Sequence, residues 1–156
     1  NDAGGDNIYS ILSKYSLNKK NVTLYYSLGR KLYWGLLNLA KDPKYRVVCV
    51  GNSSSGIKET PAFGCSAVNI GSRQLGRLRS NNVIDTNYDK DAIYNAIKKC
   101  LFDDKFRNQS RTSINPYGTG NTAKKMIDVI KNLQINDKLR TKKMTIKGIR
   151  KNGWYK

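Results

Sequence analysis

Short apolar runs alternate along this chain with longer segments in which apolar residues recur every three or four positions. The run RVVCV at residues 46–50 is nearly continuous in apolar character, which is typical of a buried strand in a parallel sheet. Residues 89–101 place Ile93, Ile97 and their neighbours on one face, which predicts an amphipathic helix. This alternation favours an α/β fold, a Rossmann-like parallel sheet with helices on both faces.

The same two patterns predict the other elements. Helices are expected at residues 6–15, 30–40, 56–63 and 122–133. Strands are expected at residues 21–26, 67–70 and 83–85, with loops at 41–45, 71–82 and 115–121. Gly64 is expected to close the helix at 56–63 because glycine readily adopts the left-handed conformation of a helix end.

The chain has 156 residues, about one domain's worth, and 38% of them are apolar. No window approaches the roughly 18 apolar residues that a membrane span needs, and no signal peptide is visible. The first residue is Asn1 rather than an initiator Met, so we expect a fragment of a longer protein. We expect a cytoplasmic protein that does not associate with membranes.

Cysteine and histidine usage limits the possible chemistry. Cys49, Cys65 and Cys100 are widely spaced and form no CxxC pair, which disfavours a zinc site and favours small buried hydrophobes in a reducing compartment. The absence of histidine excludes Ser–His and Cys–His catalysis and histidine metal ligands from this chain. Catalysis by these residues would have to use Asp, Glu, Lys, Tyr or Arg.

The net charge of +18 points to an anionic partner such as nucleic acid, a membrane surface or a phosphorylated ligand. Residues 135–156 carry eight basic side chains and one acid, so 8 − 1 = +7 of this charge lies in a basic tail. The other basic residues are dispersed among Asn and Ser, which makes a nucleic-acid role the less favoured interpretation. A solvated extension is the simpler interpretation of the tail.

The stretch VCVGNSSSGIKE at residues 48–59 places three serines directly after a predicted strand. It fails as a P-loop because Ile57 stands where the phosphate-binding Lys is required. It fails as a nucleophile elbow because Asn52 replaces the first glycine and no histidine is present to activate Ser54.

Two interpretations of the serines remain equally open. In one, they are an ordinary helix cap and turn. In the other, residues 53–56 form the N-terminus of a helix at the carboxyl end of a strand, where free backbone N–H groups and serine hydroxyls bind an anion. Gly56 would let a phosphate approach closely. Glu59 lies one helical turn after Ser55, where it could accept hydrogen bonds from a ribose diol.

Three arginines follow the next predicted strand, in the sequence GSRQLGRLR. In a parallel sheet their loop opens at the same edge as the serines. Convergent guanidinium groups from Arg73, Arg77 and Arg79 would suit a diphosphate, and the alternative is a solvated basic loop.

Several motifs in one collinear order resemble the hydrolysing UDP-N-acetylglucosamine 2-epimerases of sialic-acid and related surface-sugar biosynthesis. They are GNSSSGIKETPAFG, VNIGSRQLGRLRSNNVID and NPYGTGN followed by a helix, and NDAGGDNI and LYYSLGRKLYWGLL are also similar. The resemblance covers about residues 1–133 and implies a GT-B architecture of two Rossmann-like domains. It implies a nucleotide-binding domain at 1–134, from the C-terminal half, followed by the basic tail at 135–156.

The resemblance also implies roles for particular residues. Ser53 and Ser54 would bind the diphosphate, with Gly56 allowing close approach. Glu59 would hold the ribose and Arg73 would line the nucleotide site. The backbone around Leu28 and Gly29 would meet the uracil.

The implied reaction is anti elimination of UDP from UDP-GlcNAc, followed by hydration of the glycal with inversion at C2, which gives ManNAc and UDP. No metal or organic cofactor is expected, and a homodimer is expected for the full-length protein. The alternatives are a GT-B glycosyltransferase and a nucleic-acid-binding module that uses the tail.

The sequence departs from the family pattern in four places. The family's catalytic carboxylates and histidine lie in an N-terminal domain that this chain lacks, so we expect the isolated chain to be inactive and assign it no catalytic residue. Residues 41–46 look like an insertion, Ser66 replaces a common Pro, and the tail after Leu133 has no recognised counterpart.

Overall fold

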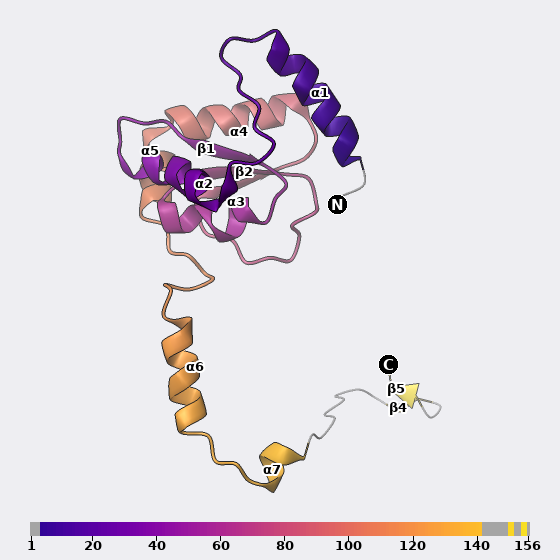
Figure 1. Ribbon diagram of the computed structural model, residues 1–156, viewed down its shortest axis with the longest axis vertical. Coiled ribbons are helices and arrows are strands. Elements are labelled where there is room, and N and C mark those ends of the chain that lie inside the picture. Colours follow the sequence, from indigo (N-terminus) through magenta and orange to yellow (C-terminus); the bar gives the residue numbers. More distant parts are fainter. Residues whose placement is uncertain (1–3, 142–149, 152–153, 156) are drawn as a thin grey trace. The chain divides into compact units, whose positions relative to one another are not determined.

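A computed structural model describes residues 4–141, 150–151 and 154–155 (Figure 1). The chain forms two compact units, one that ends at Tyr117 and one that starts at Gly118. The first unit contains a parallel sheet of strand order β1-β2-β3, which confirms the predicted α/β class. Its strands are β1 (Val48–Gly51), β2 (Ser66–Ile70) and β3 (Val83–Thr86).

The first unit forms helices at most of the predicted positions. They are α1 (Gly5–Leu17), α2 (Gly29–Asn38), α3 (Ser55–Lys58), α4 (Lys90–Phe102) and α5 (Asp104–Arg111), with 3-10 helices η1 (Leu39–Lys41) and η2 (Thr60–Phe63). The expected helix at 56–63 is therefore split into α3 and η2. Gly64 follows it with φ of 62°, so its predicted role as the closing residue is confirmed.

The strand pleat separates two apolar clusters, one on each face of the sheet. On one face, strand residues including Val48, Val68 and Ile84 pack with α4 and with Phe106 of α5. On the other face, Cys49 and Cys65 pack with α2 and its extension. Figure 1 shows α4 on one side of the sheet and α2 and α3 on the other, so helices lie on both faces as predicted.

Two strand predictions need correction. Residues 21–26 form no strand: this segment links α1 to α2 without pairing, although Val22 and Leu24 alternate with exposed neighbours as in a strand. A β-rich sequence needs a partner strand, and the described residues supply none for it. The run at 46–50 does form β1, but the strand is half-buried and Val50 is 42% exposed. Within the described residues β1 is an edge strand that pairs with β2 alone.

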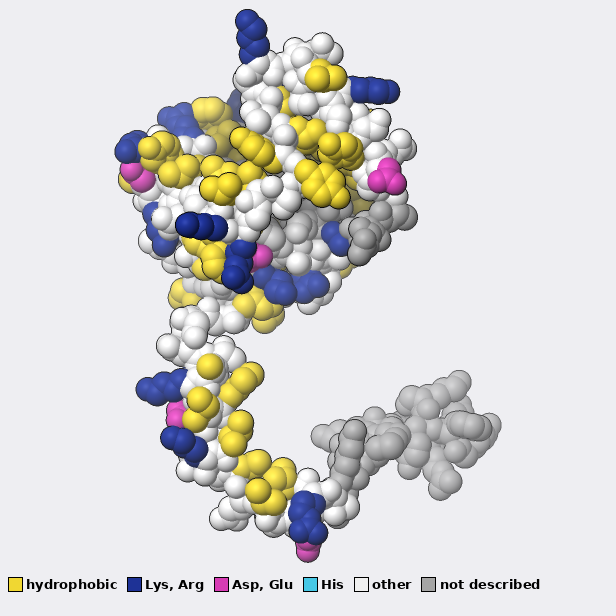
Figure 2. All heavy atoms as spheres, viewed as in Figure 1, with side chains coloured by type: hydrophobic (Ala, Val, Ile, Leu, Met, Phe, Trp, Pro, Cys, Tyr) yellow, Lys and Arg dark blue, Asp and Glu magenta, His cyan; other side chains and the backbone are white. Residues whose placement is uncertain are grey.

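The second unit contains the predicted helix α6 (Thr122–Lys131), followed by α7 (Asp137–Arg140) and a short antiparallel pair, β4 (Arg150–Lys151) with β5 (Trp154–Tyr155). The apolar side chains of α6 are exposed and follow one side of the helix in Figure 2. Much of the predicted basic tail, residues 142–149, 152–153 and 156, lies outside the described residues, and the boundary at 134 stays a prediction. No helix in the described ranges is both long and apolar enough to cross a bilayer.

Candidate functional site

The carboxyl ends of β1 and β2 bring two loops together. The serine turn, residues 52–56, follows β1, and the loop with Arg73 and Gln74 follows β2. Gln74 Nε2 donates to the carbonyl oxygen of Asn52 at 2.8 Å, and Arg73 Nη1 reaches the same oxygen at 3.5 Å. Arg73 therefore lies beside the serine turn, at the sheet edge where α/β folds bind ligands.

Two backbone donors of the serine turn have no acceptor among the residues that the structure describes. The carbonyl oxygen of Ser53 accepts from Gly56 N at 3.2 Å, and that of Ser54 accepts from Ile57 N and Lys58 N at 3.1 and 2.9 Å. Within the described part of the chain, the N–H groups of Ser53 and Ser54 themselves have no hydrogen-bond acceptor. Ser53 is exposed and Ser54 half-buried, so a ligand at this edge can reach both.

Gly56 stands beside a cavity of about 30 Å³ beneath the serine turn, lined also by Cys49, Ser53 and Asn69. A Cβ atom added at Gly56 would meet Cys49 Sγ at 3.8 Å, an ordinary van der Waals contact, and its φ is not positive. Neither the backbone conformation nor the packing of the described residues therefore requires glycine at this position.

Ser55 is held by a helix on the other side of the turn. Its hydroxyl shares a hydrogen bond with the Tyr33 hydroxyl of α2, and Tyr33 also lies 3.6 Å from Cys49 Sγ. Burial raises the pKa of Tyr33 well above its ordinary value, and the Ser55 hydrogen bond offsets only part of that rise. Tyr33 therefore keeps its proton at physiological pH.

Glu59 ends α3 one helical turn after Ser55, and its side chain is half-buried. Its Oε2 accepts a hydrogen bond of 2.5 Å from the indole nitrogen of Trp34. The Trp34 ring also contacts Phe63 at 5.9 Å between centroids and lies 5.2 Å from the Arg30 guanidinium. The Trp34 indole thus restrains the Glu59 carboxylate, and its ring contacts Phe63 and Arg30 while staying 40% exposed.

Leu28 is the N-cap of α2 and Gly29 is its first residue, about one helical turn before Tyr33 and Trp34. Gly29 has φ of 63°, and its N–H donates to Ser27 Oγ at 3.2 Å. No hydrogen bond joins Leu28 or Gly29 to the serine turn among the described residues. Helix α2 contacts the turn through Tyr33, which meets Ser55, and contacts Glu59 after the turn through Trp34.

The three arginines of the β2–β3 loop do not converge. Arg79 forms an ion pair with Asp85 at 2.8 Å and donates to the carbonyl oxygens of Gln74 and Arg77 at 2.9 and 2.7 Å. Its guanidinium therefore holds the loop in shape. Arg77 is exposed. Within the described residues, Arg73 is the one of the three with a hydrogen bond to the serine turn.

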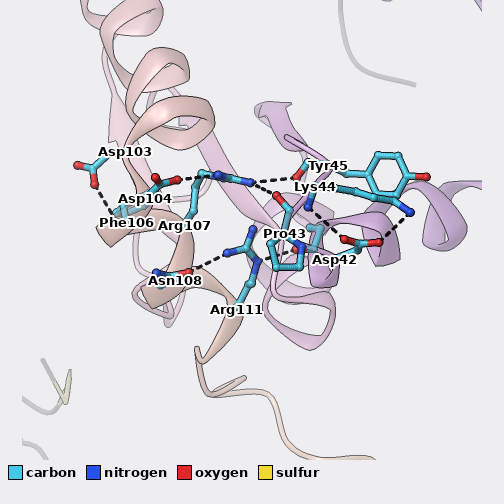
Figure 3. A network of polar contacts seen from close by, with 11 residues as sticks. Asp42, Pro43, Lys44, Tyr45, Asp103, Asp104, Phe106, Arg107, Asn108 and Arg111 are labelled. Carbon is cyan, nitrogen blue, oxygen red and sulfur yellow. Dashed lines mark hydrogen bonds and ion pairs between the residues drawn. The ribbon is translucent and has the colours of Figure 1, made fainter.

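Arg107 and Arg111 of α5 stabilise the segment that connects η1 to β1 (Figure 3). Arg107 donates to the carbonyl oxygens of Pro43 and Tyr45 at 2.7 and 3.2 Å, and Arg111 donates to that of Ala40 at 3.0 Å. Guanidinium groups satisfy the carbonyls at the end of a helix and in the loop after it. The segment predicted to be an insertion is therefore a loop that α5 holds against the sheet.

Ser53, Ser54 and Gly56 lie in the turn after β1 with Arg73 beside it, and Glu59 follows one helical turn later at the end of α3. A family model, described as UDP-N-acetylglucosamine 2-epimerase, matches residues 1–131. The chain belongs to this family. The resemblance found in the sequence motifs is thereby confirmed.

Individual relatives of this epimerase-family chain carry related names. UDP-N,N'-diacetylbacillosamine 2-epimerase (hydrolyzing) of Legionella pneumophila is 31% identical over 90% of this chain and 34% of its own length. GDP/UDP-N,N'-diacetylbacillosamine 2-epimerase (hydrolyzing) of Campylobacter jejuni is 42% identical over 54% of this chain and 21% of its own. Polysialic acid biosynthesis protein P7 of Escherichia coli is 40% identical over 56% of this chain and 22% of its own length. The chain thus spans between a fifth and a third of these relatives.

Sequence reasoning missed three residues whose side chains form hydrogen bonds to the candidate site residues or to the turn that carries them. Tyr33 and Trp34 were read only as part of a helix, and Gln74 as a loop residue. Their partners Ser55, Glu59 and Asn52 lie 22 to 25 residues away in the sequence. The one available signal was Trp34, a large aromatic residue outside the predicted apolar stripe of this helix, which runs through Leu32 or Tyr33, Leu36, Leu37 and Ala40.

Proposed function

We propose that this chain is the UDP-binding part of a hydrolysing UDP-N-acetylglucosamine 2-epimerase. The observation that carries the proposal is the serine turn, where the N–H groups of Ser53 and Ser54 have no acceptor within the described residues. Paired backbone N–H groups at the carboxyl end of a parallel strand form a site for phosphate oxygens. Gly56 supports this assignment because a closely approaching ligand supplies a reason for a glycine that the fold does not require.

The other predicted contacts fit around this diphosphate site. Arg73 lies beside the turn and would add a positive charge to the bound phosphates. Glu59 presents a carboxylate one helical turn on, oriented by Trp34, and would accept hydrogen bonds from the two ribose hydroxyls. Leu28 and Gly29 would meet the uracil through their backbone. These groups would bind the nucleotide in its ground state.

In the proposed reaction, the chain's residues act on the leaving group. As a base outside this chain removes the C2 proton, the C1–O bond to the diphosphate breaks, a glycal forms and UDP leaves with an added negative charge. N–H groups fixed before the reaction stabilise such a developing charge without reorganising. Water then adds hydrogen at C2 and hydroxyl at C1, which gives ManNAc.

Thermal unfolding with and without UDP tests the proposal. A ligand that binds only the folded state raises the midpoint, and Ser54→Ala and Glu59→Ala are expected to reduce the rise. Thr112→Ala is the control because Thr112 is exposed at the end of α5 and its hydroxyl donates to the carbonyl oxygens of Asn108 and Gln109, at 3.1 and 3.3 Å. Absence of any UDP effect on a folded chain would contradict the proposal.

The sugar and the product are tested with the full-length protein. We expect it to release UDP and free ManNAc from UDP-GlcNAc. Sugar transfer to an acceptor would favour a glycosyltransferase instead. Faster turnover of UDP-N,N'-diacetylbacillosamine would move the substrate assignment to the sugar named in the Legionella and Campylobacter relatives.

A further inference from the structure

Two consecutive residues of α2 contact the two ends of α3. The Tyr33 hydroxyl meets the hydroxyl of Ser55, and the Trp34 indole meets the carboxylate of Glu59. Ser55 and Glu59 lie four residues apart and so occupy one face of the helical segment. One short stretch of α2 thus holds both ends of the segment that carries the proposed phosphate and ribose contacts.

The Tyr33 contact reaches the serine turn through Ser55. The N–H of Ser55 donates to Ser53 Oγ at 3.4 Å, so the residue that Tyr33 holds also fixes the side chain of Ser53. The Tyr33 ring packs in the cluster with Leu37 and Cys65, which anchors its hydroxyl on the core. Because the partner of Tyr33 carries no ligand contact in the proposed site, the hydroxyl acts on the nucleotide only through the shape of the turn.

The Trp34 contact acts on a different part of the site. The indole N–H occupies Oε2 of Glu59, which restricts the rotation of the carboxylate and leaves Oε1 directed away from that bond. A carboxylate restrained in this way has lost part of its rotamer freedom before a ribose arrives, so less entropy is lost on binding.

We propose that Tyr33 and Trp34 are positioning residues of the nucleotide site, Tyr33 for the serine turn that binds the diphosphate and Trp34 for the carboxylate that binds the ribose. This inference rests on the proposed function of the chain. Two adjacent side chains of one helix would thus support the binding of the diphosphate and of the ribose, respectively. The same helix begins at Leu28 and Gly29, the proposed uracil contact, so α2 supports the site along the whole nucleoside diphosphate.

Because Tyr33 and Trp34 support different parts of the site, substituting each should weaken the binding of different ligands. Tyr33→Phe keeps the ring and removes the hydroxyl, so it should weaken UDP binding and leave uridine binding unchanged. Trp34→Phe keeps an aromatic ring against Phe63 and removes the N–H donor, so it should weaken UDP and uridine alike. Loss of one hydrogen bond that orders a binding group corresponds to about a three- to tenfold rise in the dissociation constant.

Ligand-observed NMR titrations of UDP and uridine against the 156-residue chain test this, with Tyr94→Phe on α4 as the matched control. Hydrogen exchange of the ligand-free chain gives a second readout, since Tyr33→Phe should speed exchange in residues 53–58 and Tyr94→Phe should not. Equal losses for UDP and uridine in Tyr33→Phe, or no loss in either variant while the unsubstituted chain binds UDP, would overturn the inference alone. An unsubstituted chain that binds no UDP would overturn the proposed function and this inference with it.

Discussion

The side-chain amide of Gln74 donates to the carbonyl oxygen of Asn52 at 2.8 Å, which ties the loop after β2 to the serine turn after β1. Gln74 is only 4% exposed, so this hydrogen bond is shielded from water. The guanidinium of Arg73 reaches the same oxygen. The distance between the two loops, and with it the place of Arg73, therefore depends on a buried amide.

Gln74→Ala is expected to lower the free energy of unfolding by about 1 kcal/mol, the usual net worth of one hydrogen bond, and to weaken UDP binding. The matched control is Gln109→Ala, because Gln109 also donates to a backbone carbonyl, that of Asn81 at 2.7 Å, but is exposed. Urea denaturation measures the free energy of unfolding of both variants. A larger loss of stability in Gln109→Ala would contradict the role given to Gln74.

Asn82 is expected to be the most sensitive polar residue of the first unit. It is fully buried and donates to Thr60 Oγ1 at 2.9 Å and to the carbonyl oxygen of Cys65 at 2.7 Å, and Thr60 in turn donates to the carbonyl oxygen of Gly56 at 2.7 Å. Asn82→Ala leaves a buried carbonyl unpaired, which costs about 1 to 3 kcal/mol. The exposed neighbour variant Asn81→Ala should stay within about 0.5 kcal/mol of the unsubstituted chain. Equal stabilities in denaturant unfolding would rule out this network.

Gly64→Ala is expected to destabilise the chain more than Gly71→Ala. Both glycines have positive φ, 62° and 75°, so alanine costs about 1 to 2 kcal/mol in strain at either. At Gly64 the new Cβ would also lie 2.9 Å from the Cα of Arg111, a backbone atom of α5 that cannot move aside. At Gly71 it would meet the Tyr88 ring, which is 76% exposed and can rotate away. Comparable losses in thermal unfolding would contradict this difference.

Stability is expected to fall as the pH rises from about 9 to 12. Burial raises the pKa of Cys65 and that of Cys100 to about 12, above the 9.0 of an exposed thiol. Between these values the unfolded chain loses protons that the folded chain retains, so rising pH favours unfolding. Burial raises the pKa of Tyr33 as well, which extends the effect upward. Unfolding free energies measured across this range should decline, and Cys100→Ala, although less stable at neutral pH, should show a shallower decline.

The local parts of this structure could be predicted from the sequence. Gly64 at a helix end and the turn after β1 depend on the conformational preferences of a few adjacent residues. The sheet and α4 follow from apolar periodicity. The strand predicted at residues 21–26 was wrong. A strand exists only with a partner strand, and the sequence pattern does not say whether one is present.

The parts that were missed depend on partners far along the chain. Helix α5 has Phe106 as its one buried apolar residue, and it buries Arg107 and Ser110 through hydrogen bonds rather than an apolar stripe. The pairing of Arg79 with Asp85 and of Trp34 with Glu59 could not be read from spacing either. The ligand contacts proposed for the candidate site stay predictions, and the side-chain contacts that support those residues were missed.

The central claim is that the serine turn binds the diphosphate of UDP, and amide NMR of the labelled chain during a UDP titration tests it most directly. We expect the largest chemical-shift changes at the amides of Ser53, Ser54 and Gly56 and smaller ones at Glu59 and Arg73. The changes in the turn should be lost when uridine replaces UDP. Shifts confined to the basic tail, or no shifts in a folded chain, would contradict it.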